Sequence, residues 1–164
     1  MLTSPSPSVV ISEKESVIFS SFCVLEKFSI PVSDYNITIN FPGGMPVDGP
    51  SAGIALFAAC YSALNKTEIS NKIAMTGELS IMGGVNPVGG VREKIEGAKN
   101  SGAETVIIPA ANYYGDLDRL GVKILPVHTI DEVVGYICGK PEQGAEYGEN
   151  SEAVAVSGCG QPAF

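Results

Sequence analysis

The segment NPVGGVREKIEGAKNSGAETVIIP, from Asn86 to Pro109, contains in order a glycine-rich turn, a helical pattern and a short strand pattern. Apolar residues at intervals of three and four predict a helix that ends near Gly102. One side of this helix carries Val91, Lys94, Ile95 and Ala98. The apolar run from Thr105 to Ile108 predicts a strand. A helix followed directly by a strand is the repeating unit of folds that alternate the two.

The same alternation continues after this segment. A polar connection runs through Asp118, and a further strand is predicted from Val122 to Val127. Thr129 and Glu132 have the spacing of a capping box at the start of a last helix. The apolar stripe of that helix consists of Ile130, Val133, Val134 and Ile137.

The alternation also extends toward the N-terminus. Helices are predicted from Lys14 to Phe28 and from Ser51 to Leu64; the second has Pro50 at its first position and is apolar on all sides, so we expect it to be deeply buried. Strands are predicted from Tyr35 to Phe41 and from Lys72 to Ile81, followed by a tight loop or hairpin in GGVNPVGG. These elements predict an α/β (α+β) sheet fold.

Composition indicates one folded domain in a chain of 164 residues, 45% of them hydrophobic and 17% charged. We assign that domain to residues 14–139, between a flexible Ser/Pro-rich lead-in at 1–13 and a disordered tail at 140–164. The formal net charge of -8 argues against nucleic acid as a partner. The longest apolar run, Gly53 to Leu64, is too short to span a bilayer.

Cysteine usage points to a reducing compartment and away from a metal site. Four cysteines lie far apart without a CxxC pair, and His128 is the one histidine of the chain. The first residues lack the charge pattern of a secretory signal, so we expect a cytoplasmic protein without a metal. We expect His128 to be structural rather than catalytic.

Lys94 is the most informative single residue because it shares a predicted helix face with Val91 and Ile95. A lysine on such a face is partly removed from water, and burial favours the neutral amine, which is a base. The alternative is that its side chain extends along the apolar surface and keeps the ammonium in water. From its position alone, the second interpretation is the more common.

Ser51 opens the predicted buried helix directly after the turn sequence VDGP. Its hydroxyl lies beside backbone N–H groups that have no partner inside the helix, at the positive end of the helix dipole. Such donors can stabilise an oxyanion. The alternative, more frequent for an isolated serine, is that the hydroxyl caps its own helix.

Taken together, the pattern resembles the proteolytic domain of Lon proteases, particularly the LonB branch. Three blocks carry the resemblance in the family's order and spacing: FPGGMPVDGPSAG from Phe41 to Gly53, MTGELS from Met75 to Ser80, and the segment from Asn86 to Pro109. The resemblance covers about Lys14 to Gly139. It implies a Lon-type domain with a mixed sheet flanked by helices, and a serine endopeptidase that cleaves unfolded or damaged proteins.

The resemblance also assigns residues. The serine of the DGPSAG block is the family's nucleophile and the lysine of the last block its general base, which implies a Ser-Lys dyad of Ser51 and Lys94. It implies further that Thr76 orients the lysine and that Asp48 influences the lysine or the active-site loop. On the residues alone, Thr76 also fits an ordinary strand threonine, and Asp48 fits a simple Asp-Gly turn.

The resemblance further implies polypeptide substrates, a homo-hexameric ring and an AAA+ ATPase that unfolds the substrate. The chain contains no GxxxxGKS or GxxxxGKT loop, so we expect no cofactor here, with ATP and Mg²⁺ acting only through a separate module. The strands that usually precede the first helix are not recognisable, so we expect a domain that is incomplete on its N-terminal side. The alternative function is a Lon-like assembly or binding module without proteolysis.

Overall fold

The computed structural model describes residues 15–37 and 49–138, where helices and strands alternate along the chain. The helices are α1 (Glu15–Lys27), α2 (Gly53–Asn65), α3 (Val91–Asn100) and α4 (Ile130–Ile137). The strands are β1 (Ile73–Met75), β2 (Glu78–Leu79), β3 (Val85–Asn86), β4 (Thr105–Pro109) and β5 (Lys123–Val127). Short 3-10 turns connect them: η1 (Val32–Asp34), η2 (Pro50–Ala52), η3 (Ala110–Asn112) and η4 (Gly115–Leu120).

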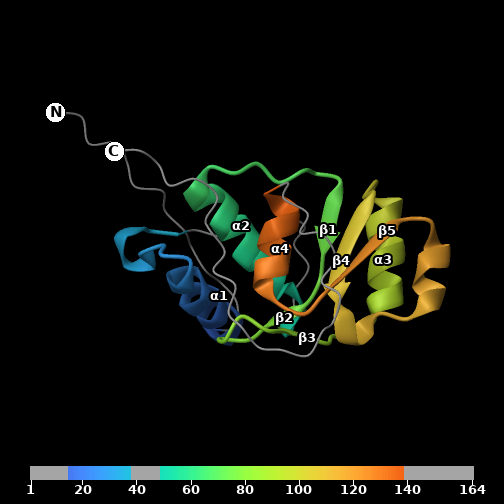
Figure 1. Ribbon diagram of the computed structural model, residues 1–164, viewed down its shortest axis with the longest axis horizontal. Helices are drawn as coiled ribbons and strands as arrows, with labels where there is room; N and C mark the ends of the chain where they lie inside the picture. Colours follow the sequence, from blue (N-terminus) through green and yellow to red (C-terminus); the bar gives the residue numbers. More distant parts are fainter. Residues whose placement is uncertain (1–14, 38–48, 139–164) are drawn as a thin grey trace, which may run out of the picture.

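A parallel sheet in the order β1-β4-β5 forms the centre of the molecule, and β2 and β3 pair separately as an antiparallel hairpin. Parallel neighbours need a crossover connection, and α3 provides it between β1 and β4. Figure 1 shows α3 on one side of the sheet, α2 and α4 on the other, and α1 beyond α2. The predicted α/β fold class is confirmed.

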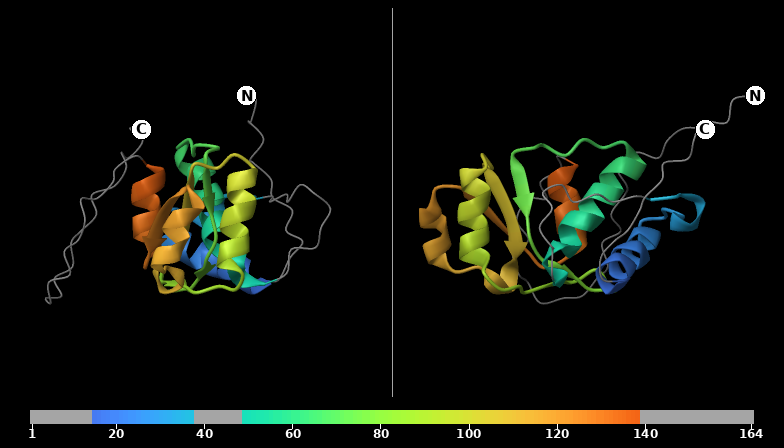
Figure 2. Two further views of the ribbon diagram at one scale, coloured as in Figure 1. Left: turned by 90° about the vertical axis from the view of Figure 1, so that its right-hand side faces the viewer. Right: turned by 180° about the vertical axis from the view of Figure 1, so that it is seen from behind.

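Side chains of β4 point alternately into two apolar clusters, one on each face of the sheet. Ile107 packs in the cluster with α1, α2 and α4, whereas Val106 and Ile108 pack with Val91 and Ile95 of α3. All five side chains are at most 7% exposed. A strand buried on both faces is typical of parallel sheets covered by helices, which the views in Figure 2 also show.

Helix α1 packs against α2 through aromatic side chains and sets the position of α2. The ring of Phe28 lies 5.5 Å from both Phe57 and Tyr61, centroid to centroid. At the start of α2, the buried Ser21 hydroxyl donates a 3.5 Å hydrogen bond to the carbonyl of Gly53. Ser21 of α1 therefore contacts the start of α2, and Phe28, which directly follows α1, contacts its middle.

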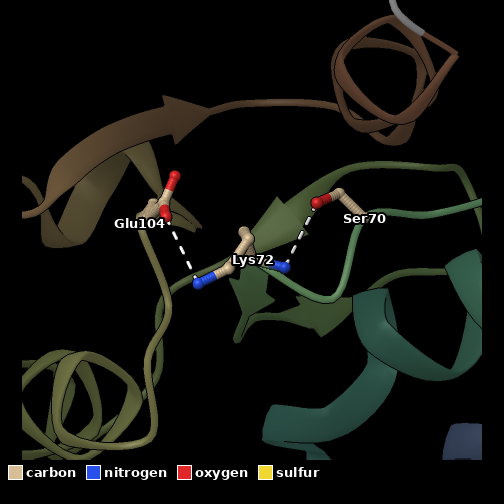
Figure 3. Close-up of polar contacts among 3 residues, drawn as sticks. All are labelled: Ser70, Lys72 and Glu104. Atoms are coloured by element: carbon tan, nitrogen blue, oxygen red, sulfur yellow. Dashed lines mark hydrogen bonds and ion pairs between the residues drawn. The ribbon is translucent and has the colours of Figure 1, made fainter.

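Polar contacts join β1 and β4 at their amino ends (Figure 3). The carbonyl of Lys72 accepts the N–H groups of Glu104 and Thr105 at 2.9 and 3.1 Å. The Lys72 ammonium lies 3.3 Å from a Glu104 carboxylate oxygen, and its backbone N–H donates to the Ser70 hydroxyl. The ion pair is exposed and contributes little, so the backbone bonds hold this end of the sheet.

Two predicted elements differ from the structure between residues 51 and 81. The strand predicted from Lys72 to Ile81 is divided into β1 and β2, because Thr76 and Gly77 turn toward the start of α2 and bond to it. The helix predicted from Ser51 begins as η2 and becomes α-helical at Gly53. Ala59 and Ala63 of this helix are exposed, so it is not buried on all sides.

Three further predictions concern a hairpin, a helix cap and a strand. The hairpin expected after Ile81 is present as β2 and β3. The capping box is wrong in detail: Glu132 accepts the His128 N–H at 3.1 Å and the Thr129 hydroxyl at 3.4 Å, while that hydroxyl caps no backbone group. Within the strand predicted from Tyr35 to Phe41, residues 35–37 form no regular element and the rest lies outside the described residues.

The predicted domain limits and terminal segments, 1–13 and 140–164, also lie outside the residues that the structure describes. In the described part of the chain, no helix has the length and apolar character needed to cross a membrane.

Candidate functional site

A pocket of about 320 Å³ lies between the start of α2, the end of β1 and helix α3. Ser51, Thr76 and Lys94 all line it. The remaining lining side chains are apolar and mostly small: Ala52, Ala55, Ala74, Met75, Ala98 and Val106. The fold therefore brings three of the four predicted site residues to one cavity, and the fourth, Asp48, lies outside the described residues.

Ser51 is placed by the turn η2 that precedes α2. Gly49 has φ +97°, a conformation that favours glycine, and Pro50 occupies the first position of the turn, as predicted. Ser51 is half-buried and lies at the positive end of the dipole of α2. The hydroxyl is thus carried at a helix start beside a cavity, which suits a nucleophile.

The backbone of Ser51 is fixed by the turn that follows β1. Its carbonyl accepts the Gly77 N–H at 2.9 Å and the Thr76 hydroxyl at 3.1 Å. The Gly77 carbonyl in turn accepts the Ile54 N–H at 3.2 Å. Three hydrogen bonds therefore join η2 and the first turn of α2 to residues 76 and 77, which limits how far Ser51 can move.

Thr76 is 6% exposed and lines the pocket together with Lys94. The hydroxyl proton is used in the bond to the Ser51 carbonyl, but a hydroxyl that donates still has acceptor lone pairs. Thr76 can therefore hold the Ser51 backbone and accept a hydrogen bond from an amine in the pocket. The first of these roles was not predicted from the sequence.

Glycine is required where α2 meets β2. A Cβ added at Gly53 would lie 2.7 Å from the Leu79 nitrogen and 3.3 Å from the Gly77 carbonyl oxygen. This close approach allows the Ile54 N–H to reach Gly77. Sequence reasoning did not assign a role to Gly53, although the Ser-Ala-Gly sequence at a helix start could have indicated close packing.

Lys94 comes from the opposite side of the pocket, in the first turns of α3. Gly90, with φ +65°, precedes the helix, and its carbonyl accepts the Lys94 N–H at 3.0 Å. Val91 and Ile95 on the same face are buried, and Lys94 is half-buried. The Lys94 side chain therefore belongs to the apolar face of α3 and also lines the cavity.

Two N–H groups at the start of α2 are already engaged. The Gly53 N–H donates to the Pro50 carbonyl, and the Ile54 N–H donates to Gly77. Oxyanion donors expected at this helix start must therefore come from residues before Gly53, and Ser51 and Ala52 carry the nearest N–H groups.

Other described polar residues of the matching blocks, and the single histidine, lie outside the pocket. His128 is exposed and is not one of the residues that line the pocket. Glu78 accepts a 3.4 Å hydrogen bond from Asn86, and Arg92 lies 3.6 Å from Glu96 on the outer face of α3. Within residues 15–37 and 49–138, no group of three His, Cys, Asp or Glu residues could hold a metal ion.

Comparison with known proteins agrees with this geometry. The family described as the Lon protease (S16) C-terminal proteolytic domain matches residues 13–138. The chain is 50% identical over 119 residues to Lon protease 2 of Bacillus subtilis strain 168, covering 72% of this chain and 22% of that protein. It is 37% identical over 136 residues to Lon protease of Orientia tsutsugamushi strain Ikeda, covering 76% of this chain and 17% of that protein.

A third relative, Lon protease of Haemophilus influenzae, is 41% identical over 119 residues, covering 68% of this chain and 15% of that protein. The chain thus spans between 15 and 22% of the length of these three relatives.

Proposed function

The chain belongs to the Lon protease (S16) C-terminal proteolytic domain family, and we propose that it is a serine endopeptidase with Ser51 as nucleophile and Lys94 as general base. One observation carries the proposal: a serine at a helix start and a lysine from the helix across the sheet edge line the same small cavity. Neither side chain needs a metal for this chemistry.

In the proposed mechanism, the neutral amine of Lys94 removes the proton from the Ser51 hydroxyl as the oxygen attacks the peptide carbonyl. The developing oxyanion is stabilised by backbone N–H groups before Gly53 and by the positive end of α2. The lysine returns its proton to the leaving amine, and an acyl-enzyme forms on Ser51. Water then attacks the acyl group with Lys94 again as base, which regenerates the free serine.

Thr76 has a positioning role in this proposal. Its hydroxyl holds the Ser51 carbonyl, and the residue lines the cavity together with Lys94. Asp48, one residue before Gly49, is proposed to influence the lysine or the adjoining loop, as the resemblance implies.

Substrates, oligomeric state and partner modules form a separate proposal, because the chain spans about a fifth of the length of its relatives. We propose that the substrates are unfolded or damaged polypeptides, that the active form is a homo-hexamer in the cytoplasm, and that an AAA+ ATPase module with ATP and Mg²⁺ delivers the substrates. The peptidase step itself is proposed to need no cofactor in this chain.

Hydrolysis of a fluorogenic peptide by the purified chain tests the proposal. Ser51→Ala and Lys94→Ala should each lower kcat at least about 100-fold, because each removes one half of the proton-transfer pair. A metal chelator should leave the activity of the unmodified chain unchanged.

Matched controls are Ser101→Ala and Lys123→Ala, which make the same changes at exposed positions away from the pocket. Both should retain full activity. Equal turnover in all five proteins would reject the dyad. Absence of turnover in all of them, with a defined oligomer in analytical ultracentrifugation, would instead favour the assembly or binding module.

A further inference from the structure

The side chain of Asn112 binds both polar groups of a single backbone residue, Val88. Its Oδ1 accepts the Val88 N–H at 2.8 Å, and its Nδ2 donates to the Val88 carbonyl at 3.0 Å. Asn112 ends η3, directly after β4, and is half-buried. One side-chain amide therefore replaces the strand partner that residue 88 would otherwise need.

Val88 is separated from α3 by Gly89 and Gly90 only. A Gly-Gly link has more conformational freedom than any other dipeptide, and Gly90 uses this freedom to adopt φ +65°. The position at which α3 begins is therefore poorly determined by its own chain. It must be fixed by contacts on either side of the link, and the side chain of Asn112 provides paired hydrogen bonds on the N-terminal side.

The start of α3 is also where Lys94 is attached. The Lys94 N–H closes the first turn on the Gly90 carbonyl, and Val88 packs against the same apolar cluster as the pocket residues Ala74 and Ala98. Because this cluster also contains Val91 and Ile95 of α3, a shift of Val88 displaces the turn that carries the amine through side-chain packing. Misplacement of a catalytic group by about 1 Å can lower the rate on the order of 100-fold.

We propose that Asn112 is a positioning residue for Lys94: through Val88 it sets where α3 begins and so where the amine stands in the pocket. This rests on the proposed Ser-Lys peptidase function. Asn112 itself touches no reacting atom; it acts from the carboxyl end of β4 by holding Val88 against the apolar cluster of α3.

Asn112→Asp is the most direct test because it keeps the size of the side chain. The carboxylate can still accept the Val88 N–H, but it loses the donor and places an anionic oxygen against the Val88 carbonyl. In the fluorogenic peptide assay, kcat should fall about tenfold or more, with KM within about twofold. Amide hydrogen exchange at Val88 and Lys94 should accelerate, while exchange in α2 stays unchanged.

Two controls separate positioning from charge and from loss of stability. Asn71→Asp makes the same charge change at an exposed turn residue and should leave kcat and exchange unaltered. Val133→Ala truncates a fully buried side chain of α4, remote from α3, and should lower the thermal midpoint without a selective loss of kcat.

Two results would contradict the role of Asn112. Unchanged exchange at Val88 and Lys94 in Asn112→Asp would overturn it, as would a kcat loss no greater than that of an equally destabilised Val133→Ala. If the unmodified chain hydrolyses no peptide, the proposed peptidase function fails on its own. The exchange measurement still supports or overturns the control of α3 by Asn112 in that case.

Discussion

Gly53 has no side chain, and this allows α2 to pack closely against β2 beside the site. A side chain there would meet the Leu79 backbone at 2.7 Å, so α2 would have to move away from β2 and carry Ser51 with it. Gly53→Ala should lower the free energy of unfolding by about 1–3 kcal/mol in urea denaturation and should also lower peptidase activity. Gly97→Ala, on the exposed face of α3 with nothing within 4 Å, should instead stabilise by about 0.5–1 kcal/mol. A loss at both positions would contradict this explanation.

The buried thiol of Cys60 should make the free energy of unfolding depend on pH. Burial raises the pKa of its thiol from 9.0 to about 11, so the folded chain keeps a proton that the unfolded chain loses. The free energy of unfolding should therefore fall as the pH rises from about 9 to about 11, and Cys60→Ala should remove this part of the pH dependence. Urea titrations at several pH values measure the difference. Parallel curves for the two proteins would show that the thiol does not titrate differently on folding.

At the scale of an element, the start of α4 depends on one carboxylate. Glu132 accepts the His128 N–H and the Thr129 hydroxyl, and its charge lies at the positive end of the helix. Glu132→Gln should lower the free energy of unfolding by about 0.3–1 kcal/mol at neutral pH, because it removes the charge and one of the two acceptor oxygens. Asp131→Asn removes only a first-turn charge and should have a smaller effect. Equal effects would mean that the dipole alone accounts for the role of Glu132.

At the scale of the whole molecule, β4 couples the two apolar clusters. Ile107 contributes to one and Ile108 to the other, so displacement of the strand disrupts both clusters. We expect a single cooperative unfolding transition. Near-UV circular dichroism follows tyrosine packing because the chain has no tryptophan, and its midpoint should coincide with that of the far-UV signal. Separate midpoints would show that the two faces of the sheet unfold independently.

Local sequence patterns predicted the order of the four helices and of strands β4 and β5, and the face of α3 that carries Lys94. Periodicity, turn residues and helix starts are local properties, so the predicted helices and the strands β4 and β5 agree with the structure to within one or two residues, apart from the Ser51 helix, whose first turn is 3-10. The family resemblance added the pairing of Ser51 with Lys94, which no local pattern could supply.

The contacts that hold the site together could not be predicted from the sequence. The division of the predicted strand at Thr76, the three hydrogen bonds that join residues 76 and 77 to the start of α2, and the contact of Asn112 with Val88 all link segments distant in sequence. Such contacts depend on which layers pack against each other, because a hydroxyl or amide takes whichever partner the fold brings within hydrogen-bond distance. Periodicity along one segment carries no information about that partner.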